Sequence, residues 1–172
     1  MQKKVIVING RGGVGKDTCV DVVARKYVVL NCSSITPIKK AAEMLGWDYG
    51  DKSDKARKFL SDLKMASSEF NDFPFTYLLD KYRWFMETEG VDVMFVHIRE
   101  PEEIAKFKAR VPECKTLLIK SNRTERDYGN LADDNVDNYD YDFVYRNDKP
   151  LYEVEADFLK FFEEQIFRGD ST

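Results

Sequence analysis

This sequence has little of what marks several large classes of protein. Its three cysteines, Cys19, Cys32 and Cys114, are widely spaced and odd in number, which indicates neither a disulfide framework nor a paired-cysteine metal site. Positive charge is not in excess, since the 172 residues carry a net charge of −4, and this argues against nucleic acid as a partner. No apolar run suits a signal peptide or a membrane span. We therefore expect a cytoplasmic protein with reduced thiols and no membrane partner.

The chain does have enough apolar material for one core. Hydrophobic residues make up 43% of the sequence and aromatic residues 13%. A chain of this length buries most of the surface that its unfolded form exposes. We find no internal repeat and no low-complexity linker. The composition therefore predicts a single domain over residues 1–172.

Short apolar runs alternate with amphipathic segments along the chain. The apolar runs predict strands at 3–9, 28–32, 91–98, 116–119 and 141–146. The amphipathic segments predict helices that begin at Lys16, at about 36, 56, 74 and 100, and at 151. Strands that are apolar on both faces and alternate with helices indicate a parallel sheet covered on both sides. The sequence therefore predicts a three-layer α/β fold around a parallel sheet of about five strands.

The most informative motif lies between the first strand and the first helix. Residues 10–16, Gly-Arg-Gly-Gly-Val-Gly-Lys, have the G-x-x-x-x-G-K spacing of a phosphate-binding loop, or P-loop. Its glycines let successive backbone N–H groups point at phosphate oxygens, and the following helix N-terminus adds favourable partial charge. Lys16 supplies a point charge for the β- and γ-phosphates. The competing interpretation is a glycine-rich turn with a solvated lysine, but the strand before it and the helix after it favour the P-loop.

Two polar residues follow the P-loop lysine. Asp17 stands where most P-loops have a serine or threonine, and Thr18 comes one residue later. A carboxylate is a hard oxygen ligand, so Asp17 is a candidate ligand for Mg²⁺. Alternatively, Asp17 only stabilises the helix N-terminus, and the two roles are compatible. Thr18 is placed to reach the α-phosphate of a bound nucleotide.

The run Gly15-Lys16-Asp17-Thr18 resembles the G-K-D-T of bacteriophage-type deoxynucleoside monophosphate kinases, which belong to the nucleoside monophosphate kinase superfamily. P-loop phosphomevalonate kinases share this run. Residues 37–39 (Pro-Ile-Lys) resemble the P-x-K that follows the second strand of these kinases, and residues 97–103 resemble their D-x-R-x-x-x-E segment. Residues 141–148 resemble their last strand, whose exit loop, here with Asn147, lies near adenine. The resemblance implies the nucleotide kinase type of P-loop NTPase fold, with ATP and Mg²⁺ as cofactors.

The resemblance also implies a division of the site. The implied donor site comprises Gly10, Arg11, Gly12, Gly13, Val14, Gly15, Lys16, Asp17, Thr18 and Asn147. A helical segment at about 36–88 would bind the acceptor, and a lid at about 121–140 would bring Arg123 and Arg126 over the transferring phosphoryl group. With Lys16, these two arginines are the expected catalytic residues, since a guanidinium spreads its charge over several oxygens. The alternative is a solvated loop in which the arginines pair with Asp127, Asp133 or Asp134.

Three further cations are candidates for binding the phosphate of the acceptor. Arg57 belongs to the helical segment, and Lys39 belongs to the P-x-K match. Arg99 follows a core strand, so it emerges at the carboxyl edge of the sheet, where open α/β sheets bind ligands. The competing interpretation for Arg57 and Arg99 is a surface salt bridge.

One position departs from the family pattern. His97, the only histidine of the chain, stands where the family has an aspartate that helps to hold Mg²⁺. Without that aspartate, both the coordination of Mg²⁺ and phosphoryl transfer are in question. The simpler interpretation is a histidine at the end of a strand, hydrogen-bonded to the backbone.

The residues after the second strand bear on the acceptor. Kinases of hydroxyl acceptors benefit from a base, which in related enzymes is often a carboxylate at this place. Here residues 31–34 read Asn-Cys-Ser-Ser, without an acid, and a phosphate acceptor needs no base. We therefore expect an ATP-dependent phosphotransferase acting on a nucleoside or deoxynucleoside monophosphate. The alternatives are a kinase for another small phosphorylated metabolite, of the phosphomevalonate or dephospho-coenzyme A type, and a nucleotide-binding protein with little transferase activity.

Overall fold

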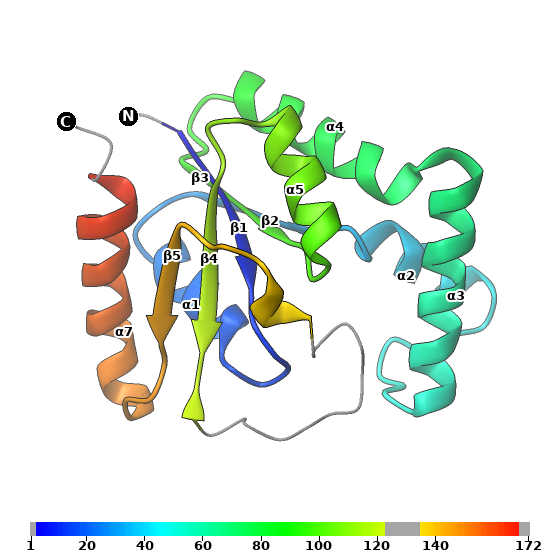
Figure 1. Cartoon of the computed structure of the whole chain (residues 1–172), viewed down its shortest axis with the longest axis horizontal. Coiled ribbons are helices and arrows are strands. Elements are labelled where there is room, and N and C mark those ends of the chain that lie inside the picture. Colours follow the sequence, from blue (N-terminus) through cyan, green and yellow to red (C-terminus); the bar gives the residue numbers. More distant parts are fainter. Residues whose placement is uncertain (1–2, 123–134, 169–172) are drawn as a thin grey trace. The chain divides into compact units, whose positions relative to one another are not determined.

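A computed structural model describes residues 3–122 and 135–168 (Figure 1). The chain divides into two compact units, one made of Met1–Asn31 with Thr88–Thr172 and the other of Cys32–Glu87. The second unit covers nearly the same residues as the helical segment expected at about 36–88. Its role in binding an acceptor stays a prediction.

A parallel sheet is the framework of the protein. Its strands are β1 (Lys4–Asn9), β2 (Val29–Ser33), β3 (Val93–His97), β4 (Lys115–Lys120) and β5 (Phe143–Arg146), in the order β2-β3-β1-β4-β5. β1 pairs in parallel with both β3 and β4, and β4 pairs in parallel with β5. The expected five-stranded parallel sheet is therefore confirmed, and the carboxyl ends of its strands meet at one edge.

Helices cover one face of this sheet with the main apolar core. α1 (Lys16–Ala24) and α7 (Leu151–Phe161), continued by the π-helical segment η3 (Phe162–Phe167), supply its helical side. Ile6, Ile8, Phe95, Leu117 and Ile119 from the strands pack with Val20, Val23, Phe158, Phe162 and Ile166 from the helices. Strand residues of this set are two apart because alternate side chains of a strand share a face.

The opposite face is covered by α5 (Pro101–Arg110). Ile104 and Phe107 of α5 are fully buried, as is Val7, which points away from the core of α1 and α7. Both faces of the sheet are thus covered, and the three-layer α/β architecture expected from the sequence is confirmed.

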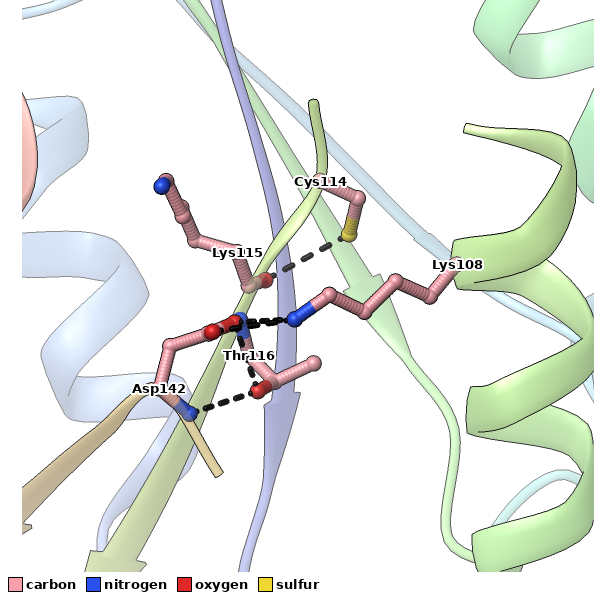
Figure 2. A network of polar contacts seen from close by, with 5 residues as sticks. All are labelled: Lys108, Cys114, Lys115, Thr116 and Asp142. Carbon is pink, nitrogen blue, oxygen red and sulfur yellow. Dashed lines mark hydrogen bonds and ion pairs between the residues drawn. The ribbon is translucent and has the colours of Figure 1, made fainter. Parts of the chain in front are cut away.

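A polar clasp, formed by Lys108, Thr116 and Asp142, joins α5 to the start of β4 and the approach to β5 (Figure 2). The Asp142 carboxylate accepts hydrogen bonds from the Lys108 ammonium at 2.7 Å, from the Thr116 backbone N–H at 2.8 Å and from the Thr116 hydroxyl at 2.9 Å. The Asp142 N–H donates to the Thr116 hydroxyl oxygen at 2.8 Å. Partial burial alone would raise the pKa of Asp142, but these donors outweigh it and the pKa is lowered.

Replacing Asp142 with asparagine should lower the free energy of unfolding by about 1–3 kcal/mol at neutral pH, because Lys108 and Thr116 lose a charged acceptor. The pKa is lowered on folding, so the carboxylate stabilises the fold above its ordinary value of 3.8, and this contribution is lost as the pH falls through the lowered value. Urea unfolding at about pH 7 and about pH 3 should therefore show a difference that shrinks in acid. Asp62→Asn, which breaks the exposed pair with Lys58, is the control, with an effect within about 0.5 kcal/mol. An equal difference at both pH values would contradict the role of the charge.

The second unit consists of α2 (Thr36–Met44), α3 (Asp54–Asn71) and α4 (Phe73–Glu87). Ser53 begins α3 by accepting a hydrogen bond from the Ala56 N–H at 3.2 Å. The apolar spacing of the sequence indicated only the first part of α3. The second part carries no buried stripe that could have indicated it, and Ala56 is the only buried residue of the helix. Across the described residues, no helix is both long and apolar enough to cross a membrane.

Candidate functional site

The P-loop joins the end of β1 to the start of α1, at the carboxyl edge of the sheet. Gly10, Gly13 and Gly15 have φ angles of 153°, 78° and 92°, which side-chain-bearing residues rarely adopt. Gly15 caps α1, and no described side chain hydrogen-bonds the helix as a cap there. The first N–H groups of α1 therefore face the loop and suit an anion.

The loop packs closely against the strands behind it. A Cβ atom on Gly10 would lie 2.5 Å from the Ile119 carbonyl oxygen of β4, and one on Gly15 would collide with the Asn147 side chain. A Cβ atom on Gly12, in contrast, would meet nothing within 4 Å. Gly10 and Gly15 must therefore be glycine, because neighbouring atoms leave no room for a Cβ atom.

Lys16 is turned into the loop. Its ammonium group donates to the carbonyl oxygens of Gly10 at 2.5 Å and Arg11 at 2.9 Å. Both acceptors belong to the loop that follows β1, so the charge of Lys16 lies among the P-loop peptides. This is where a bound phosphate chain would meet it.

Asn147, which follows β5, hydrogen-bonds the P-loop. Its side-chain N–H₂ group donates to the Val14 carbonyl at 2.9 Å, and its backbone N–H donates to the Lys120 carbonyl at 2.8 Å. The Asn147 Oδ1 atom is buried and has no hydrogen-bond partner among the described residues. A buried acceptor of this kind suits a hydrogen-bond donor, either an N–H group of a ligand or an O–H of water.

A cavity of about 300 Å³ opens beside the P-loop. It is lined by Arg11, Val14, Leu118, Ile119, Lys120, Ser121, Asn122, Val136, Asp137 and Arg146. Three of these side chains are cations and one is an acid, while the apolar members supply a hydrophobic wall. The volume is at the lower end of the range of small-molecule sites. The cavity therefore suits a ligand with an apolar surface and an anionic part.

Asp137 balances two of these cations. It lies on the short 3-10 helix η2 (Val136–Asn138) and contacts Arg11 at 3.2 Å and Lys120 at 2.7 Å. The hydrogen bond from Lys120 is the main cause that lowers the pKa of Asp137, and Arg11 adds to it. Asp137 therefore stays ionised near neutral pH and links the P-loop to the end of β4.

His97, at the end of β3, lies 2.8 Å through its Nε2 atom from the Asn31 side-chain oxygen. This contact is with a side-chain amide, and the hydrogen bond to the backbone stays a prediction. Burial lowers the pKa of His97, and Lys16 and Arg99 lower it further against the opposing effect of Asp17. The ring is therefore neutral near pH 7.

The oxygen ligands that the protein offers indicate how Mg²⁺ would be held. Among the residues that the structure describes, no cluster of three or more His, Cys, Asp or Glu side chains could hold a metal ion. Asp17 is an exposed carboxylate in the first turn of α1. Mg²⁺ is commonly held by one or two carboxylates together with substrate phosphates and water. Asp17 thus fits a metal shared with a bound triphosphate and does not fit an all-protein metal site.

Lys39 and Arg57, two further expected site residues, are each described within their own unit. Lys39 on α2 places its ammonium group 5.1 Å from the centre of the Tyr49 ring, and Arg57 is exposed on α3. Both belong to the unit Cys32–Glu87, so their part in a common site stays a prediction. Arg123 and Arg126 lie outside the described residues.

Sequence reasoning missed Lys120, Asp137 and Arg146, which line the cavity. Lys120 and Arg146 are the last residues of β4 and β5, so the rule that strand ends meet at the ligand edge was a usable signal. Asp137 lies within the polar segment 121–140 expected as the lid, where only the arginines were singled out.

Comparisons with known proteins show the fold. No protein-family model matches the sequence, and no curated protein matches it. A sugar kinase from Janibacter sp. HTCC2649 superposes with a TM-score of 0.53 at 11% identity, covering 95% of each chain. TT1252 from Thermus thermophilus superposes with a TM-score of 0.52 at 18% identity, covering 95% of this chain and 98% of its own. The sheet order, the P-loop and these superpositions together show that the chain has the fold of P-loop kinases.

Proposed function

We propose that this protein transfers the γ-phosphoryl group of ATP to a nucleoside or deoxynucleoside monophosphate. The observation that carries the proposal is the P-loop with Lys16 turned into it, beside a cavity at the carboxyl edge of the sheet. The resemblance of residues 15–18 to deoxynucleoside monophosphate kinases supports this choice of acceptor.

ATP would occupy the P-loop and the adjoining cavity. The N–H groups of the loop and Lys16 would bind the phosphates, whose negative charge suits the start of α1. The apolar side chains of Val14 and Ile119 would contact the base, and the buried Asn147 Oδ1 would accept an N–H from it. Asp17 and the phosphates would hold Mg²⁺, which supplies neutralisation of charge on the β- and γ-oxygens.

An acceptor that is already a phosphate agrees with the residues at the carboxyl end of β2. Asn31 stands at the place where a catalytic carboxylate would serve a hydroxyl acceptor, and its amide oxygen contacts His97. Arg99 emerges from β3 at the same edge as the P-loop and is our candidate for binding the acceptor phosphate. Lys39 and Arg57 are proposed for the same task from the sequence.

A second candidate function is a kinase of a hydroxyl acceptor, and His97 is the observation that favours it. The ring is neutral near pH 7 and lies at the carboxyl edge, so it has the protonation state that a general base needs. In this case His97 would replace the missing carboxylate.

A coupled assay of ADP release separates these functions. The acceptors are all ribo- and deoxynucleoside monophosphates, with phosphomevalonate and dephospho-coenzyme A as controls. Release that depends on a nucleoside monophosphate supports the proposal, whereas release only with dephospho-coenzyme A supports the second candidate. Nucleotide affinity without acceptor-dependent release would instead identify a nucleotide-binding protein.

Replacing Asp17 with alanine should raise the Mg²⁺ concentration for half-maximal rate by about tenfold, since a carboxylate ligand is lost. The measurement is a Mg²⁺ titration at saturating ATP. Asp21→Ala, an exposed carboxylate further along α1, is the control and should leave the titration unchanged. An unchanged titration for Asp17→Ala would assign the residue to the helix dipole alone.

Replacing Arg123 and Arg126 together with alanine should lower kcat by about a thousandfold while ATP affinity changes little. The proposal rests on the sequence alone, because both residues lie outside the described part. Charge that develops on the transferring group strengthens arginine contacts only as the reaction proceeds. Steady-state rates and ATP titrations of both single variants and the double variant measure this. If all three variants keep the wild-type kcat, the arginines are ordinary surface residues.

A further inference from the structure

Asn9, the last residue of β1, is a buried polar residue directly before the P-loop, with 1% of its surface exposed. Its Oδ1 atom accepts a hydrogen bond from the Gly10 N–H at 2.8 Å. Its Nδ2 group donates to the Arg99 carbonyl at 2.9 Å and to the Tyr141 hydroxyl oxygen at 2.8 Å. One side chain thus joins the start of the P-loop to the loop after β3.

The partners allow only one orientation of the Asn9 amide. The Gly10 N–H can only donate, and the Arg99 carbonyl can only accept, so a flipped amide would lose both bonds. The Tyr141 hydroxyl oxygen accepts the second hydrogen bond of Nδ2, and the Tyr141 O–H donates to the Val136 carbonyl at 2.8 Å. Because both Nδ2 hydrogens and the Tyr141 hydrogen have acceptors, the network is directional and defined.

We propose that Asn9 is a positioning residue that sets the P-loop and Arg99 relative to one another, with Tyr141 holding its amide in place. The inference rests on the proposed function, in which the P-loop binds the donor and Arg99 binds the acceptor phosphate. Transfer requires the two phosphates to meet in line at short distance, and a small misplacement of one lowers the rate steeply. Asn9 meets this requirement through two hydrogen bonds to backbone groups, one on each loop.

Three variants separate the parts of the network. Asn9→Asp keeps an acceptor for the Gly10 N–H but loses the Nδ2 donor and places a carboxylate oxygen opposite the Arg99 carbonyl. Tyr141→Phe keeps the ring and removes only the hydroxyl that orients the amide. Asn9→Ala removes every bond of the side chain and disturbs both loops.

Asn9→Asp should raise the KM of the acceptor about tenfold, and Tyr141→Phe about threefold, while the ATP affinity of Tyr141→Phe stays within about twofold of wild type. Tyr145→Phe is the matched control. The Tyr145 hydroxyl donates to Asp157 at 2.8 Å, so its loss removes an equivalent bond away from the P-loop. The control should lower Tm to a similar degree and leave the KM of the acceptor unchanged. Unchanged acceptor KM in both Asn9→Asp and Tyr141→Phe, or an equal change in Tyr145→Phe, overturns the inference.

Hydrogen exchange of the Gly10 amide, measured by NMR, tests the network without activity. Exchange should be faster in Asn9→Ala than in wild type and remain slow in Asn9→Asp, which keeps the acceptor. Absence of acceptor-dependent ADP release by the wild-type protein would refute the proposed function while this comparison still decides on the network. Equal Gly10 exchange in wild type and Asn9→Ala overturns the inference.

Discussion

Replacing Lys16 with alanine should abolish phosphoryl transfer while the fold stays intact. The ammonium group lies among the P-loop peptides, bonded to the Gly10 and Arg11 carbonyls, where it would meet the β- and γ-phosphates of the donor. Removing a charge that stabilises developing negative charge lowers kcat by about a hundredfold or more. Steady-state rates measure this loss, and circular dichroism with thermal unfolding checks the fold.

A lysine beyond the other end of α1 is the control for charge. Lys26 pairs with Glu163 at an exposed site, so Lys26→Ala removes the same charge away from the P-loop. It should keep wild-type activity. If Lys16→Ala keeps activity within about tenfold of wild type, a barrier change of roughly 1.4 kcal/mol, the P-loop is not catalytic.

Replacing Gly10 with alanine should prevent the P-loop from adopting its conformation and should weaken ATP binding by more than about tenfold. The added Cβ would lie 2.5 Å from the Ile119 carbonyl oxygen and 2.8 Å from the Val14 side chain. The carbonyl belongs to the paired strand β4, so it cannot move aside without breaking the sheet. The φ angle of 153° adds backbone strain.

Gly12→Ala is the matched control inside the same loop. A Cβ atom on Gly12 would meet nothing within 4 Å, so this variant should bind ATP nearly as wild type does. Isothermal titration with ATP and thermal unfolding of both variants compare them directly. Equal ATP affinity in Gly10→Ala and Gly12→Ala would show that the observed loop conformation does not govern nucleotide binding.

The strand order and the geometry of the site depend on contacts between distant residues. The expected strands at 3–9 and 116–119 are β1 and β4, because buried parallel strands are nearly continuous apolar runs. Their pairing, and the place of β5 beside β4, bring the cavity side chains of Lys120 and Arg146 together. No periodicity of the sequence encodes which strands are neighbours.

The sequence by itself determined the alternation of strands and helices and the position of the P-loop, since both are local patterns of apolar spacing and glycine placement. Only the tertiary structure decided that Asn9 bonds Gly10, Arg99 and Tyr141, that Asn147 braces Val14, and that His97 contacts Asn31. These contacts join residues up to 133 positions apart. These side chains come together only in the folded protein. Burial of the apolar strand residues in the core aligns the strands, and the strand ends then lie at one edge of the sheet.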